Sequence, residues 1–113
     1  MSSKSKCFND LVELMILYCL SKKTCYCYEI FKAINNDFDK EKISNNTVYT
    51  ILYRLKNKKL ISEQKVTVNK KRERVYYNIL PEGKKYFEEC LDEYNAYTCV
   101  IEKVLENSKN LIK

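Results

Sequence analysis

The strongest constraint on this fold is residues 82–107, where apolar side chains recur at alternating steps of three and four. Phe87, Tyr94 and Ile101 lie seven residues apart. Apolar or small residues fill the steps between them: Cys90, Leu91, Tyr97, Thr98, Val104 and Leu105. This spacing is typical of a helix that packs lengthwise against another helix. Pro81 suits the first turn of such a helix, where an amide hydrogen is not needed.

A helix over residues 82–107 is about 39 Å long at 1.5 Å per residue. The remainder of a 113-residue chain cannot cover a stripe of that length, so part of it must be buried elsewhere. A second copy of the chain is the simplest partner. The first helix of the same chain is the alternative partner. The two partners can also cover different parts of the helix. We expect dimer contacts from five residues of the stripe: Phe87, Leu91, Ile101, Val104 and Leu105.

The rest of the chain predicts further helices and one β-hairpin. With one Gly and one Pro, the sequence lacks the turn residues that an all-β sandwich needs. Apolar periodicity predicts three helices, over residues 8–21, 26–36 and about 45–58. Residues rich in β-branched and aromatic side chains predict two strands, 60–68 and 73–79, with a turn at 69–72.

The third predicted helix has two different faces, and Ser44 is its expected N-cap. Its inward face is apolar: Val48, Ile51, Leu52 and Leu55. Its outward face is polar, aromatic and cationic: Asn46, Tyr49, Thr50, Tyr53, Arg54 and Asn57. Side chains of this kind bond base edges and phosphates, so this face is a candidate surface for nucleic acid.

Positive charge is concentrated in the middle of the chain. Residues 41–79 carry ten Lys and Arg against three Asp and Glu, a net charge of +7. Residues 65–74 of the predicted hairpin carry five cations and one acid, Glu73: Lys65, Lys70, Lys71, Arg72 and Arg74 are the cations. This concentration favours a polyanion as partner. The alternative is a lysine-rich face and hairpin that are only solvated.

The six cysteines do not predict a disulfide framework, because no secretory signal is visible and the core needs no covalent staples. We expect a reducing cytoplasm and cysteines that mostly serve as small buried apolar residues. Cys25 and Cys27 form the one close pair. The pair could bind a soft metal or sense oxidants, but two small residues at a helix start is the simpler interpretation. No metal or cofactor is expected.

Several functional classes are disfavoured by what the chain lacks. It has no His, which excludes histidine-centred catalysis and histidine-ligated metals, and it has no glycine-rich phosphate loop. An enzyme is therefore the least favoured class. The apolar stretch 11–20 is too short to span a membrane and contains Glu13. A role at a membrane surface is also weak, because no helix pairs a broad lysine face with a large apolar one.

The predicted fold class is mainly α with a small β-hairpin, arranged as a winged helix-turn-helix with a long C-terminal dimerisation helix. We expect the winged helix-turn-helix domain over residues 1–80, the dimerisation helix over 81–107 and a tail over 108–113. A domain of this kind binds DNA in many proteins. It can also serve as a protein-interaction or dimerisation module that does not touch DNA.

Within this outline, the sequence resembles the PadR family of transcriptional regulators, in its small form with a single C-terminal helix. Residues 26–30, YCYEI, resemble the family segment YGYEI. Residues 47–55, TVYTILYRL, resemble the recognition-helix motif TLYPxLxRL. Residues 72–77, RERVYY, followed by Glu82 and Gly83, resemble GRxRxYYxLTxxG. The resemblance covers roughly residues 8–105, and the order of its motifs makes it specific.

The sequence departs from the family pattern at four places. Cys27 and Lys59 stand where the family has Gly, and Asn69 replaces Gly in the wing turn. Leu80 and Pro81 replace the usual Leu-Thr. Lys59 lies at the expected C-terminal cap of the third helix, a position that favours positive φ. Together these departures indicate a divergent member of the family.

The resemblance implies a dimeric repressor of operator DNA, which a small molecule releases in many members. It implies base and groove contacts from the recognition helix: Asn46, Thr47, Tyr49, Thr50 and, near phosphates, Arg54. It implies phosphate contacts from Tyr26 and Tyr28 and from the wing: Lys70, Lys71, Arg72 and Arg74. For Tyr28 and Tyr49, packing in the core is the alternative.

The resemblance also implies a location for an effector. In multidrug-binding relatives, an aromatic residue of the terminal helix lines a flat pore at the dimer interface. That position is Tyr94 here, with Tyr97 beside it. Two copies would bring four tyrosines near the twofold axis, where they could stack a small aromatic or cationic effector. The alternative is that the rings only pack the dimer.

Overall fold

The computed structural model describes residues 6–37, 43–69, 72–109 and 111 of the chain. Its elements are α1 (Lys6–Lys22), β1 (Cys25–Tyr26), α2 (Cys27–Asp37), α3 (Asn45–Asn57), β2 (Ile61–Asn69), β3 (Arg72–Ile79) and α4 (Pro81–Ser108). All four predicted helices and both predicted strands are confirmed to within two residues at each end. The two-residue strand β1 was not predicted. Lys70 and Lys71, expected at the wing tip, lie outside the described residues.

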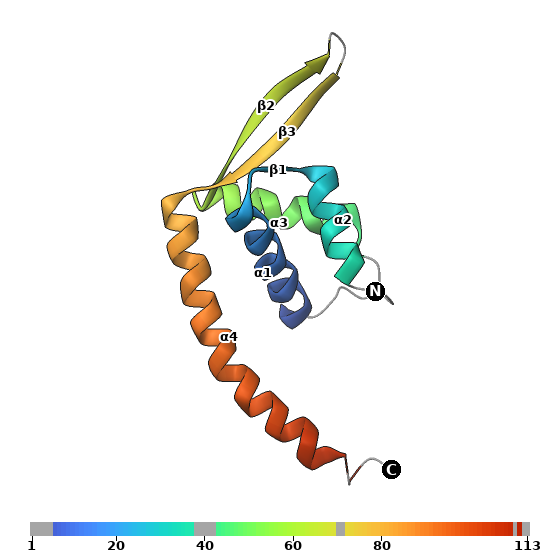
Figure 1. The fold of residues 1–113 in the computed structure, drawn as a ribbon, viewed down its shortest axis with the longest axis vertical. Coiled ribbons are helices and arrows are strands. Elements are labelled where there is room, and N and C mark those ends of the chain that lie inside the picture. The colour runs from blue at the N-terminus through green and yellow to red at the C-terminus, as the bar shows by residue number, and fades with distance from the viewer. Residues whose placement is uncertain (1–5, 38–42, 70–71, 110, 112–113) are drawn as a thin grey trace.

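The three strands form one antiparallel sheet in the order β1-β3-β2. The hairpin of β2 and β3 projects away from helices α1, α2 and α3, while β1 lies at its base (Figure 1). α4 begins at the same base, passes α1 and continues beyond the helical group (Figure 1). The molecule measures 61 × 30 × 24 Å, so it is elongated along the direction of α4 and the hairpin.

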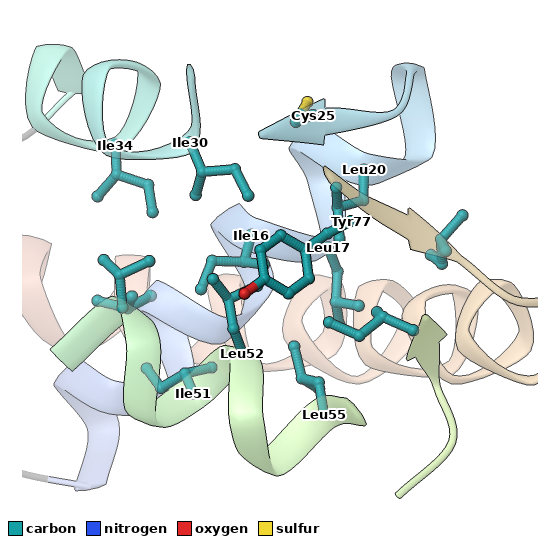
Figure 2. Close-up of a cluster of buried hydrophobic side chains, with 14 of the residues drawn as sticks. Ile16, Leu17, Leu20, Cys25, Ile30, Ile34, Ile51, Leu52, Leu55 and Tyr77 are labelled. Carbon is teal, nitrogen blue, oxygen red and sulfur yellow. The ribbon is translucent and has the colours of Figure 1, made fainter. Parts of the chain in front are cut away.

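The core lies where α1, α2, α3 and the base of the sheet meet. Ile16, Ile30 and Leu55 are fully buried, one from each helix. Figure 2 shows the ring of Tyr77 in the middle of this cluster, with Ile30 of α2 above it and Leu52 of α3 below. All four residues predicted for the inward face of α3 are buried: Val48, Ile51, Leu52 and Leu55. The apolar periodicity of this helix is therefore confirmed, and its opposite face is oriented outward.

Both ends of α3 are fixed by hydrogen bonds. Ser44 Oγ accepts a bond from the Thr47 amide at 3.2 Å, so the predicted N-cap is confirmed. At the other end, the Leu60 amide donates to the Leu55 carbonyl at 3.1 Å and the Lys59 amide to the Lys56 carbonyl at 2.9 Å. This pair of bonds is a Schellman motif, which needs a left-handed residue. Lys59 supplies it with φ of 62°, at the position where the family pattern has Gly.

Gly83 allows α4 to approach the start of β2. A Cβ built on Gly83 would overlap the carbonyl oxygen of Leu60 and lie 2.8 Å from Cγ1 of Ile79. The same Leu60 carbonyl accepts a hydrogen bond from the Leu80 amide at 3.0 Å. The first turn of α4 is thus packed directly on backbone, and this contact sets the direction in which the helix leaves the domain.

The expectation that most cysteines are buried is wrong for the described residues. Cys25 is buried, whereas Cys19, Cys27 and Cys90 are half-buried and Cys99 is exposed. The Cys25 thiol donates weakly to the Lys23 carbonyl at 3.4 Å, and burial raises its pKa. A raised pKa keeps this thiol protonated and unreactive at neutral pH. Cys99 is exposed because it lies on the part of α4 that extends beyond the helical group.

Candidate nucleic-acid interface

Three segments that are distant in the sequence line one cleft of about 430 Å³. β1 and the start of α2 contribute Tyr26 and Tyr28, α3 contributes Asn45 and Tyr49, and β3 contributes Arg74. These include predicted contact residues from the second helix, the recognition helix and the wing. The fold therefore brings the three predicted groups of residues together on one surface, although they are far apart in the sequence.

Most of the outward face of α3 is accessible, with Arg54 half-buried. Asn46 and Thr50 are exposed, and the side chains of Tyr49 and Tyr53 are 48% and 64% exposed. Thr47 is half-buried, and its hydroxyl lies 2.9 Å from Ser44 Oγ in the N-cap. Amide, hydroxyl and phenol groups along one exposed helix face present the donors and acceptors that read base edges in a major groove.

Tyr28 and Tyr49 lie at the surface. The alternative that their rings pack in the core is therefore wrong. Tyr28 is 61% exposed. Tyr49 makes an edge-to-face contact with Phe31, with ring centres 5.4 Å apart. A hydrogen bond with Cys27 raises the pKa of Tyr49, so its hydroxyl stays protonated and able to donate. Cys27 and Phe31 therefore hold the Tyr49 hydroxyl and ring, while about half of the residue surface remains exposed.

Arg74 of the wing is held by an aromatic cluster at the base of the sheet. Its guanidinium carbon lies 4.4 Å from the centre of the Tyr26 ring, a cation–π contact. The Tyr26 ring also packs on Tyr76 at 5.4 Å and on Tyr28 at 6.4 Å. A hydrogen bond with Tyr76 raises the pKa of Arg74 further above its usual range. Stacking by its face leaves the N–H edges of a guanidinium able to reach a phosphate.

The connection from β1 into α2 is fixed by Glu29. Its Oε1 accepts from the Tyr26 amide at 3.1 Å, and its Oε2 accepts from Lys23 Nζ at 2.9 Å. The hydrogen bond from Lys23 lowers the pKa of Glu29. Since β1 pairs with β3 through Tyr26 and Tyr76, this bond network holds the α2 start against the wing.

Arg54 differs from the other residues of the predicted outward face. It is half-buried, and its Nη2 lies 3.4 Å from Oε2 of Glu13 in α1. The other oxygen of Glu13 accepts a hydrogen bond of 2.6 Å from Tyr86 Oη in α4. The sequence analysis missed Glu13 and Tyr86 as site residues. The available signal was the single acid of the apolar stretch 11–20.

The distal part of α4 carries an uncovered apolar stripe. Phe87 packs against the core, but the stripe beyond it is exposed: Leu91 44%, Tyr97 51%, Val100 61%, Ile101 54%, Val104 56% and Leu105 61%. Val100 is an addition to the predicted set. Tyr94 and Tyr97 are in edge-to-face contact, with ring centres 6.4 Å apart. The first helix of the same chain therefore covers only the start of the stripe.

Two features of the described residues bear on other functions. No group of three or more His, Cys, Asp and Glu in these residues could hold a metal ion. No helix in the same part of the chain is long and apolar enough to cross a membrane.

The arrangement of α1–α4 with the hairpin can be compared with known families. The model of the transcriptional regulator PadR-like family matches residues 16–89, which span the helix-turn-helix, the wing and the start of α4. The chain belongs to the PadR-like family. The PadR-like family is a family of transcriptional regulators. The resemblance found in the sequence is confirmed.

Solved PadR-like structures agree with the fold over most of the chain. A transcriptional regulator from Clostridium thermocellum is 30% identical, with a TM-score of 0.76 over 90% of this chain and 97% of that chain. A PadR family regulator from Clostridium difficile is also 30% identical, with a TM-score of 0.70 over 83% and 97%. These similarities confirm the winged-helix fold class. Comparison with functionally curated proteins gave no match.

A third similar structure was solved with nucleic acid. It is Bacillus subtilis PadR in complex with operator DNA, 20% identical, with a TM-score of 0.65. The similarity covers 72% of this chain and 45% of that one. At this identity the likeness is one of fold.

Proposed function

We propose that this PadR-like regulator is a homodimer that binds operator DNA and represses transcription. The observation that carries the proposal is the convergence of the α2 start, the outward face of α3 and the wing on one cleft. The net charge of +7 over residues 41–79 supports a polyanionic partner. The operator complex of Bacillus subtilis PadR, a protein of similar fold, supports duplex DNA as that partner.

In this proposal α3 lies in the major groove and reads base edges. Asn46 and Thr50 are exposed at the N-terminal part of the helix, where recognition helices contact bases. Tyr49 lies beside them, and Thr47 contacts the groove from the first turn, where its hydroxyl lies 2.9 Å from the N-cap Ser44 Oγ. The amide of an Asn side chain forms two hydrogen bonds with adenine, and a hydroxyl bonds either a donor or an acceptor on a base edge. These residues are therefore expected to carry the sequence preference.

The remaining predicted residues contact the phosphate backbone. Tyr26, Tyr28 and Arg74 lie together at one end of the cleft. Arg72 is exposed at the start of β3. Lys70 and Lys71 extend this basic set in the sequence, and Arg54 lies at the flank of α3. Phosphate contacts fix orientation and add affinity without sequence preference.

The dimer is proposed to form through α4, with residues 1–80 as the DNA-binding unit. The exposed apolar stripe of the distal helix is too long for its own domain to cover. A groove of about 590 Å³ bounded by α1, α2 and α4, whose lining includes Leu14, Met15, Phe87 and Leu91, adds to this apolar surface. A twofold dimer would present its two α3 helices to half-sites about one helical turn of DNA apart.

Release by an effector is proposed at the same interface. Tyr94 and Tyr97 lie on the stripe and contact each other at right angles. In a twofold dimer the pair would recur on the facing helix. Faces of tyrosine rings attract planar aromatic molecules and cations. The ligand class that we propose is therefore a small aromatic or cationic molecule.

The test is fluorescence anisotropy with a labelled duplex from upstream of the protein's own gene, against a scrambled duplex, over a salt series. We expect tight binding that prefers the upstream duplex and weakens with salt. Asn46→Ala should reduce the preference, whereas Arg72→Ala should weaken binding to both duplexes alike. If neither duplex binds at low salt, the DNA proposal is wrong. The protein-interaction module then becomes the better account.

A further inference from the structure

Glu13 of α1 is a buried carboxylate that joins three helices. It is 7% exposed, and among the described residues it is the one charged side chain in the core. A buried carboxylate is costly unless hydrogen bonds and a counter-charge compensate it. Glu13 has both, because Tyr86 of α4 donates to Oε1 and Arg54 of α3 pairs with Oε2.

The two contacts of Glu13 are unequal. The bond from Tyr86 Oη is 2.6 Å long, a short charge-assisted hydrogen bond. The distance from Arg54 Nη2 is 3.4 Å, and the Arg54 side chain is 42% exposed. Burial and the bond to Glu13 both raise the pKa of Tyr86, so its hydroxyl remains a donor. Arg54 is thus held loosely by a carboxylate that is already well satisfied.

We propose that Glu13 is a positioning residue that restrains Arg54 from DNA, and that the Tyr86 hydroxyl weakens this restraint so that the guanidinium can reach a phosphate. The inference rests on the proposed DNA-binding function and deepens it. Tyr86 lies in the first turns of the helix that is proposed to dimerise, and Arg54 lies in the helix that is proposed to read DNA. Because Glu13 contacts both residues, a shift of α4 that moves Tyr86 would change how strongly Glu13 holds the Arg54 guanidinium.

Two nearly isosteric variants should act in opposite directions. Tyr86→Phe keeps the ring but removes the donor, so the carboxylate pairs more closely with Arg54. We expect duplex binding to weaken about three- to tenfold, with a smaller salt slope. Glu13→Gln keeps an oxygen for Tyr86 but removes the charge that attracts Arg54. We expect duplex binding to tighten about two- to fivefold, with an unchanged or larger slope.

The Arg54→Gln background separates positioning from a general charge effect. In this background Tyr86→Phe and Glu13→Gln should no longer change affinity. The matched control is Glu63→Gln. It also removes an acid that pairs with a cation of α3, because Glu63 Oε1 lies 2.8 Å from Lys56 Nζ. The effect of Glu63→Gln should persist in the Arg54→Gln background.

Anisotropy titrations with wild-type and variant dimers, each checked by thermal melting, decide the proposal. Opposite shifts that disappear without Arg54 support it. Shifts in the same direction, or shifts that survive Arg54→Gln, overturn it. If Tyr86→Phe does not fold, Glu13→Gln decides alone: tighter binding that disappears in the Arg54→Gln background supports the proposal, and any other result overturns it. Failure of the wild type to bind any duplex overturns the proposed function and this inference together, whereas wild-type binding with the wrong variant pattern overturns this inference only.

Discussion

The guanidinium of Arg74 lies over the ring of Tyr26, with its carbon 4.4 Å from the ring centre. Arg74 belongs to the wing and Tyr26 to the short strand that leads into α2. Because β1 pairs with β3 at this point, through Tyr26 and Tyr76, the contact fixes the wing relative to the rest of the cleft that we propose faces DNA. A cation fixed in this way is oriented before DNA arrives, which reduces the entropy lost on binding.

Arg74→Ala should weaken binding to specific and scrambled duplexes to similar extents. The loss of one phosphate contact lowers the salt slope by about 1. Tyr26→Leu should act in the same direction but more weakly, because it removes the platform and keeps the charge. Anisotropy over a salt series measures both variants. A loss confined to the preferred duplex, with an unchanged slope, would show that Arg74 reads bases instead.

Lys59→Gly should raise the stability of the protein by about 1 kcal/mol, because Lys59 has a φ of 62° that Gly adopts without cost. Lys58→Gly is the matched control. Lys58 has an ordinary helical φ of −82°, so Gly there adds only unfolded-state freedom and should destabilise. Thermal or urea unfolding of the two variants gives the answer. Equal effects from both substitutions would contradict the assignment of the cap.

Gly83→Ala should destabilise the protein by about 1–3 kcal/mol, since the added methyl group overlaps backbone that cannot rotate away. Lys84→Ala, one exposed position further along α4, should change stability by less than about 0.5 kcal/mol. Urea unfolding compares the two. If Gly83→Ala is as stable as the wild type, the close approach of α4 to Leu60 is not required.

Ile101→Glu should convert the proposed dimer to a monomer. Ile101 is 54% exposed in the single chain and lies within the apolar stripe, so a carboxylate there would be buried unpaired in the dimer. Lys103→Glu, on the opposite side of the helix, changes the charge more and should leave the dimer intact. Sedimentation velocity reads the mass of each. A wild-type protein that sediments as a monomer would rule out the dimer before any variant is made.

The sequence predicted those parts of the fold that follow from local pattern. The inward face of α3 recurs with helical period, Ser44 and Pro81 begin helices for local reasons, and the hairpin has its own composition. Strand β1 escaped prediction because two residues are too few to show alternation. It exists only because Cys25 and Tyr26 meet Tyr77 and Tyr76, about fifty positions later in the chain.

The sequence predicted which residues belong to the candidate site better than it predicted how they are arranged. The motifs gave Tyr26, Tyr49 and Arg74, but not their convergence on one cleft, which depends on tertiary packing. The position of Arg54 was not predictable from its helix, because a long side chain turns toward whichever acid is near. That acid is Glu13, 41 positions earlier in the chain.

The central claim is that a symmetric dimer of this PadR-like protein reads DNA through α3. Selection of duplexes from a random pool by the wild-type protein tests it most directly. The account predicts enrichment of an inverted repeat whose half-sites are centred about 10 base pairs apart, or a multiple of one helical turn. Asn46→Ala should lose part of that enrichment. Recovery of a pool without any enriched sequence, or with a site lacking symmetry, would contradict the claim.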